Sequence, residues 1–145
     1  MRKITALIAG AAIIAAIILS FSACAKTYPA KTEEQIVDML SGCGIETAGS
    51  CTKKTVTIPD EFGEVYERYN ELQKRQGFDL SRYRSREAVV YTFPVASVDG
   101  VHTDFAEAHV MVCDDIIIGG DLADTGLSGG MLPLLSRSKD DRAQA

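Results

Sequence analysis

The chain has 145 residues, 46% of them hydrophobic, and a formal net charge of −5, which is enough for one domain and little else. Beyond Cys24 the balance is more acidic, with 13 basic against 20 acidic side chains, a net charge of −7. Because no basic stripe interrupts this acidic body, the composition argues against binding to nucleic acid and against electrostatic binding to an anionic membrane surface.

Residues 1–24 have the layout of an export signal. They begin with basic residues, continue with an apolar run of 18 residues from Ile4 to Phe21, and end in small residues. The run is longer than the usual signal core and just reaches the roughly 17–25 residues that span a bilayer. A glycine and several alanines dilute it, which disfavours a permanent span. We therefore predict a signal peptide over residues 1–24.

The end of this segment, FSAC, resembles a bacterial lipoprotein signal, in which an apolar residue and two small ones precede a lipid-bearing cysteine. Phe21 departs from the usual leucine. Two alternatives stay open: ordinary cleavage after Ala25, within the small-x-small sequence ACA, and retention of the run as a membrane helix. Because two acyl chains hold a protein to a membrane where one does not, a diacylglyceryl group on Cys24, with acyl chains such as palmitate, would suffice as an anchor.

Residues 25–31 are expected to form a tether, followed by a domain over residues 32–132. The sequence TEEQIVDMLSGCG predicts a short helix, because it opens with a capping box at Thr32 and its apolar residues share one side. The sequence KKTVTIP then predicts a strand that Pro59 stops.

A longer helix is predicted within residues 59–77, where apolar residues recur at helical spacing and Gly77 supplies a left-handed stop. The apolar face consists of Phe62, Val65, Tyr66, Tyr69 and Leu72. Packing in the core is the simpler interpretation of its two tyrosines. The functional interpretation is a ligand groove between this helix and the sheet, lined by Tyr66 and Tyr69.

After a connecting loop the hydrophobic period changes to two, which predicts strands in EAVVYTFPV, EAHVMVC and IIIGGDL. Asp114-Asp115 can form the tight turn between the last two, since aspartate tolerates positive φ. The predicted order is therefore α-β-α-β-β-β, an α+β fold with both helices packed on one face of a small antiparallel sheet. Residues 133–145 are expected to form a flexible polar tail.

The cysteines fit an exported protein. If Cys24 carries lipid, an odd number remains: Cys43, Cys51 and Cys113. Cys43 and Cys51 bracket the turn-rich GIETAGS and could close into a disulfide; two unpaired thiols are the alternative. We expect no zinc site, because no C-x-x-C or H-x-x-x-H spacing occurs.

No catalytic pattern in the sequence is complete. GLSGG fits the nucleophile elbow G-x-S-x-G at Ser128, but no histidine follows it and the order of elements is wrong for an α/β hydrolase. His102 could pair with Asp99 or Asp104, although a solvated loop is the simpler interpretation. We therefore lean against an enzyme.

The remaining ligand patterns are equally weak. His109 and Cys113 point the same way on a strand but lie about 13 Å apart, too far to share a metal ion. Asp121 and Asp124 could offer oxygen ligands to calcium, yet the EF-hand pattern is absent. No phosphate loop or dinucleotide fingerprint occurs, and we expect no cofactor.

The run TIPDEFGEVYERYNELQKRQGFDLSRYRSR and the later IIGGD resemble the exported proteins grouped as domain of unknown function 4830, over roughly Thr32 to Met131. The sequence departs from the family pattern at Cys43 and Cys113, which speaks against a redox role for either. The resemblance implies surface exposure and a small α+β fold. It carries over no catalytic residue, because the family has no established activity.

These observations favour a lipid-anchored binding module on the extracytoplasmic side of the cell membrane. The alternatives are a single-pass or a secreted protein in location. In function they are a small hydrolase that uses Ser128 or the His102/Asp104 pair, and an envelope inhibitor or assembly factor with a protein partner.

Overall fold

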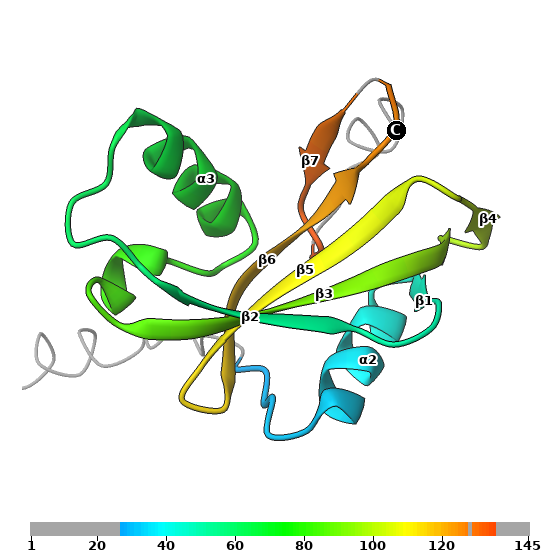
Figure 1. The fold of residues 1–145 in the computed structure, drawn as a ribbon, viewed down its shortest axis with the longest axis horizontal. Coiled ribbons are helices and arrows are strands. Elements are labelled where there is room, and N and C mark those ends of the chain that lie inside the picture. The colour runs from blue at the N-terminus through cyan, green and yellow to red at the C-terminus, as the bar shows by residue number, and fades with distance from the viewer. Residues whose placement is uncertain (1–26, 128, 136–145) are drawn as a thin grey trace, which may run out of the picture.

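The computed structural model describes residues 27–127 and 129–135 (Figure 1). The predicted signal peptide with Cys24, the serine at position 128 and the residues from 136 onward lie outside this part of the chain. The described residues form two α-helices, one 3-10 helix and a seven-stranded antiparallel sheet, which confirms the α+β class. Among them, no helix is both long enough and apolar enough to cross a membrane.

The helices and strands follow the chain in the order shown in Figure 1. The helices are α2 (Glu33–Gly42), α3 (Glu64–Arg75) and the 3-10 helix η1 (Leu80–Tyr83). The strands are β1 (Ile45–Thr47), β2 (Thr52–Thr57), β3 (Glu87–Val98), β4 (Val101–His102), β5 (Ala106–Cys113), β6 (Ile116–Asp124) and β7 (Gly130–Leu132).

Both predicted helices and the predicted strands β2, β3, β5 and β6 are confirmed. The short strands β1, β4 and β7 and the helix η1 were not expected, because two or three residues cannot display an alternating pattern. The turn between β5 and β6 is also as expected. Asp114 and Asp115 have φ values of 50° and 60°, the left-handed pair that a type I′ hairpin turn requires.

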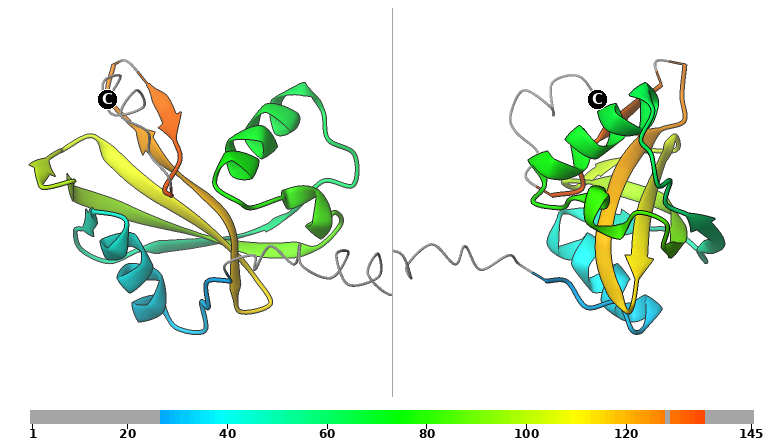
Figure 2. Two further views of the ribbon diagram at one scale, coloured as in Figure 1. Left: turned by 180° about the vertical axis from the view of Figure 1, so that it is seen from behind. Right: turned by 90° about the vertical axis from the view of Figure 1, so that its left-hand side faces the viewer.

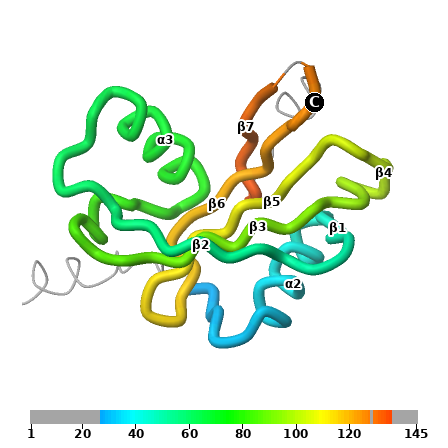
Figure 3. The backbone as a smooth tube through the Cα atoms, in the orientation of Figure 1, coloured from blue at the N-terminus to red at the C-terminus, as the bar shows by residue number. Residues whose placement is uncertain are grey.

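Strand β3 organises the sheet (Figure 3). Along one edge its first half pairs with β2, up to Thr52 opposite Thr92, and its second half pairs with β1, from Thr47 opposite Val95. Pro94 lies where the partner changes, a position where its missing N–H interrupts no ladder. The other edge of β3 pairs with β5, and β6 and β7 follow outward.

The two helices lie on opposite faces of this sheet (Figure 2), which corrects our expectation that both pack on one face. On one face α2 packs against Phe93 and Val110, together with their neighbours along β3, β5 and β6. On the other face α3 and η1 cover Ala88, Met111 and Ile118. The physical reason is that the central strands bury both of their faces, so that one helix could not cover all of their apolar side chains.

The buried side of α3 also differs from the expected apolar face. Val65 is 83% exposed, whereas the helix residues that become buried are Asn70, Leu72 and Gln73. Tyr66 and Tyr69 are partly buried and pack against the apolar cluster on this face. The helix therefore meets the sheet through amides as well as through apolar side chains.

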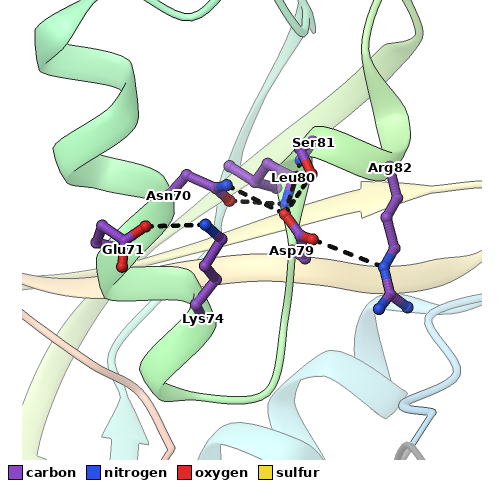
Figure 4. A network of polar contacts seen from close by, with 7 residues as sticks. All are labelled: Asn70, Glu71, Lys74, Asp79, Leu80, Ser81 and Arg82. Carbon is purple, nitrogen blue, oxygen red and sulfur yellow. Dashed lines mark hydrogen bonds and ion pairs between the residues drawn. The ribbon is translucent and has the colours of Figure 1, made fainter.

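Asn70 connects α3 to η1 (Figure 4). Its Oδ1 accepts a hydrogen bond from the Leu80 backbone N–H at 2.8 Å, and its Nδ2 donates to the Asp79 carboxylate at 3.1 Å. Asp79 in turn accepts from the backbone N–H and the hydroxyl of Ser81, which lowers the pKa of this carboxyl group. Asn70 thereby satisfies the backbone of the buried Leu80 and holds the loop in place.

Two glutamines at the end of α3, Gln73 within the helix and Gln76 directly after it, contact the outer edge of β6, the edge that faces away from β5. Gln73 Oε1 accepts from the Gly120 N–H at 2.8 Å, and Gln76 Nε2 donates to the Gly120 carbonyl at 2.9 Å. Gln76 Oε1 also accepts from the Leu135 N–H at 3.0 Å. These amides give the backbone of β6 the partners that a neighbouring strand would otherwise supply.

Both ends of the described chain pack into the folded domain, although the sequence predicted a tether at one end and a tail at the other. Ala30 donates to the Asp115 carbonyl and Tyr28 accepts from the Ile117 N–H, so that this part of the predicted tether pairs with the start of β6. At the other end, Leu134 is 1% exposed and packs in the core on the α2 face. This corrects the expected boundary of the tail at residue 133.

We predict that Gly120→Ala destabilises the protein strongly. A Cβ at this position would lie 2.4 Å from the His109 carbonyl oxygen and 2.5 Å from Leu134 Cδ1, and the backbone of β5 cannot move aside easily. Overpacking of this kind costs about 1–3 kcal/mol or more in the free energy of unfolding, measured by urea denaturation.

The matched control is Gly42→Ala in α2, where nothing lies within 4 Å of the added Cβ. This change should leave the free energy of unfolding unchanged or raise it by up to about 1 kcal/mol, because alanine favours a helix over glycine. Equal stability of the two variants would contradict the close packing at Gly120.

Candidate functional site

One part of the sheet is covered by neither α2 nor α3 (Figure 1). It lies on the α3 face, beyond the end of that helix, over β3, β5, β6 and β7. We call it the open face and define it by six cross-strand neighbours: Thr92, Pro94, Glu107, His109, Ala123 and Met131. Pro94 and Met131 are exposed, and the other four are partly exposed.

The residues of the open face, together with the buried Asp121, form two rows that cross the strands. Thr92 of β3 lies opposite His109 of β5, which lies opposite Asp121 of β6. In the next row Pro94 lies opposite Glu107, followed by Ala123 and Met131. The row nearer to α3 is therefore polar, and the outer row is apolar apart from one carboxylate.

Asp121 is the buried centre of the polar row. It is 2% exposed, and its two carboxylate oxygens have different partners. The Tyr69 hydroxyl donates to Oδ1 at 2.8 Å from α3, and His109 Nδ1 lies 3.0 Å from Oδ2. Because a carboxylate only accepts, Nδ1 carries the hydrogen in this contact, and the Nε2 atom lies toward Glu107 at 3.6 Å.

These contacts perturb the titration of Tyr69 and His109. Burial and the neighbouring Asp121 carboxylate raise the pKa of Tyr69, so that its hydroxyl stays protonated and remains a donor. The hydrogen bond to Asp121 raises the pKa of His109, with a further contribution from Glu107, although partial burial acts in the opposite direction. The cluster therefore favours an imidazolium held between two carboxylates.

The chemistry of the cluster is limited by what surrounds His109. An aspartate on Nδ1 is the arrangement that orients a histidine base in hydrolases, but such a base must also reach a nucleophile. In the part of the chain that the structure describes, no hydroxyl or thiol is hydrogen-bonded to His109. Within the same residues, no group of histidine, cysteine and acidic side chains is placed to hold a metal ion.

Comparison with known proteins identifies the family of this chain. Residues 43–122 match the family described as Domain of unknown function (DUF4830). The chain belongs to this family. No curated protein and no solved structure matches it.

In this DUF4830 domain, the residues that carry the sequence resemblance are those that join α3 to the sheet. The run YNELQKRQGFDLS contains Tyr69, Asn70, Gln73 and Gln76, each of which hydrogen-bonds across to η1 or β6. The later GGD contains Gly120, the partner of Gln73 and Gln76, and Asp121, the partner of Tyr69. These residues of the resemblance thus join α3 to η1 and to β6.

The structure places the other predicted site residues apart from this network. His102 ends the short strand β4 and its Nε2 lies 3.1 Å from Asp104 Oδ1, but both side chains are about three-quarters exposed to solvent. Cys113 is buried on the α3 face. Asp124 accepts a hydrogen bond from the Gly126 N–H within its own turn. The serine of the GLSGG pattern lies outside the described residues.

Cys43 and Cys51 are not brought together. Cys43 directly follows α2, and Cys51 directly precedes β2. The nearby strand residues Ile45 and Thr52 pair with β3 at Val98 and Thr92, six residues apart, which corresponds to about 20 Å along the strand. Disulfides need Cα atoms roughly 4.4–6.8 Å apart. Both residues are thiols in the structure. Cys43 Sγ contacts the Met39 sulfur. Burial, together with a hydrogen bond to Glu33, raises the pKa of the Cys51 thiol.

The predicted groove at Tyr66 and Tyr69 stays a prediction. The structure places the Tyr69 hydroxyl on Asp121 and packs Tyr66 between Phe62 and Tyr69, with ring centroids 4.6 and 6.1 Å away. Tyr69 therefore borders the open face, and Tyr66 packs behind it against the apolar cluster under α3. Sequence reasoning missed Asp121 and His109 as partners, because only the pairing of β5 with β6 brings them together.

We predict a pH-dependent stabilisation by His109. Because its folded-state pKa lies above the unfolded value of about 6.5, the stabilisation is fully present below that value and is lost as pH rises through the folded-state pKa. His109→Gln keeps a donor toward Asp121 but removes the charge. The wild type should therefore exceed this variant in urea midpoint by more at pH 5.5 than at pH 8.5.

The control is His102→Gln, whose exposed pair with Asp104 is screened by solvent and should leave the midpoint unchanged at both pH values. A difference between wild type and His109→Gln that stays constant, or that grows with pH, would refute the ion pair with Asp121.

Proposed function

We propose that the protein is a binding domain held by a lipid at Cys24 on the extracytoplasmic side of the cell membrane, with the open face as its binding surface. The observation that carries the proposal is the position of this face relative to the N-terminal segment. Tyr28 and Ala30 join the sheet at the start of β6, beside the β5–β6 turn. The open face lies about 20 Å further along β6, around Ala123.

This arrangement suits a tethered binding domain for a physical reason. A chain anchored through residues that precede Thr27 is attached at one end of β6, and the open face lies toward the other end of the same strand. A partner could therefore reach the face without displacing the anchor. The acidic body disfavours a second, electrostatic attachment to anionic headgroups, so that the anchor alone would hold the domain.

The anchor is tested with Cys24→Ala in the full-length chain, expressed in bacteria that are fed an alkyne analogue of palmitate. The wild type should be labelled and should have the mass of a chain that begins at Cys24, whereas the variant should be unlabelled and retain the mass of the precursor. Cys51→Ala, which removes a different cysteine, should be labelled like the wild type.

An unlabelled wild-type protein would overturn the lipid anchor. Its mass then identifies the alternative, since a chain of full length indicates a retained membrane helix and a released chain beginning after Ala25 indicates secretion.

The binding surface is tested separately by site-specific photo-crosslinking in cells. A benzoyl-phenylalanine introduced at Met131, on the open face, should give a discrete crosslinked product. The same group at Asp38, an exposed residue of α2 on the opposite face, should give none. A product from position 38 alone, or from neither position, would contradict the open face as the binding surface.

A further inference from the structure

The strands that form the open face contain acidic side chains but no lysine or arginine. From Glu87 to Leu135 the sequence contains eight acidic side chains and no lysine or arginine. Strands β3, β5, β6 and β7 all lie within this segment. The lysines and arginines of the described chain belong instead to the residues before Glu87, among them β2, α3 and the loop that follows η1. On the open face itself the accessible carboxylate is Glu107, and the only basic group on these strands of the face is the His109 imidazole, 3.6 Å from Glu107.

Exposed apolar side chains concentrate at the same end of the molecule. Among the described residues, five large hydrophobic side chains are strongly exposed, and four of them lie in or beside the strands of the open face. Met131 is 59% exposed on β7, and Phe105 is 62% exposed directly before β5. The remaining two, Val101 and Leu127, lie in β4 and in the β6–β7 connection. Such a concentration marks an interaction surface more than a scatter of single residues does.

We propose that the open face docks a segment of a partner protein that carries apolar side chains next to lysine or arginine. The inference rests on the proposed binding function and specifies the chemistry of the partner. The apolar side chains would lie on Pro94, Ala123 and Met131, and a basic side chain would reach the Glu107 carboxylate between them. In this row the acidic side chain lies between apolar ones, so the row favours a partner in which a basic side chain lies between apolar ones.

Other occupants fit the charge less well. A second copy of the chain, paired face to face, would bring no lysine or arginine of these strands to the Glu107 carboxylate. An anionic membrane surface offers no cation either, and the acidic body of the chain is repelled by it. Residues 136–145, SRSKDDRAQA, offer three basic side chains but also two aspartates, and alanine is their only apolar residue.

The test is a titration of the ¹⁵N-labelled protein, beginning at Lys26, with a capped hexapeptide that alternates lysine and leucine. Backbone amide shifts should change at Glu107, Ala123 and Met131 and should define a saturable dissociation constant. Two further peptides separate the contributions: lysine alternating with serine should bind at least about tenfold more weakly, and glutamate alternating with leucine should not bind.

Two variants locate the site. Glu107→Lys should weaken binding of the lysine–leucine peptide about tenfold, whereas Asp38→Lys, which makes the same charge change on the opposite face, should alter it less than about twofold. Met131→Ser should also weaken binding. Because Met131 is exposed, this change should not disturb folding.

Three results would overturn the proposal: equal binding of the lysine–serine peptide, equal weakening by Asp38→Lys, or binding that appears only after residues 136–145 are removed. The last result would identify these residues as the occupant. If no peptide binds while the crosslink from position 131 forms, the binding function stands and the partner chemistry is wrong. If the crosslink also fails, both are wrong.

Discussion

The outer edge of β6 is the constraint on which most of this structure depends. A central strand must find partners for the backbone groups on both of its edges, and β5 satisfies only one of them. The other edge is completed in three sections. The N-terminal residues Tyr28 and Ala30 bond to its start, the α3 glutamines bond to Gly120 in its middle, and β7 pairs with its end.

This division explains why the two faces of the sheet are built differently. On the α2 face the contacts are apolar, with Ile36 and Leu40 fully buried against the strands. On the other face the amides at the end of α3 hydrogen-bond to the edge of β6, and the helix ends there. The next residues of β5, β6 and β7 therefore have no helix over them. The open face and the buried Asp121 beside it are consequences of this position.

The sequence predicted the elements well and their packing poorly, and particular residues show why. Thr32, Gly77 and the Asp114-Asp115 pair act within a few residues of themselves, so that capping and turn chemistry revealed them. The side of α3 that meets the sheet was predicted from its apolar residues, and Val65 was wrongly placed in the core. Gln73 and Gln76 look like solvent-facing residues until the edge of β6 is known to need them.

What the sequence determined by itself was local and compositional: the signal-like start, the acidic body, the helices, the main strands and the membership of a family. The tertiary structure alone decided which residues meet. His109 and Asp121 are twelve residues apart, and Tyr69 lies fifty-two residues before Asp121, so that no short-range pattern joins them. The pairing of β5 with β6 places His109 beside Asp121, and the hydrogen bonds between the Gly120 backbone and the glutamines at the end of α3 place Tyr69 there as well. Both contacts exist only once the sheet has formed.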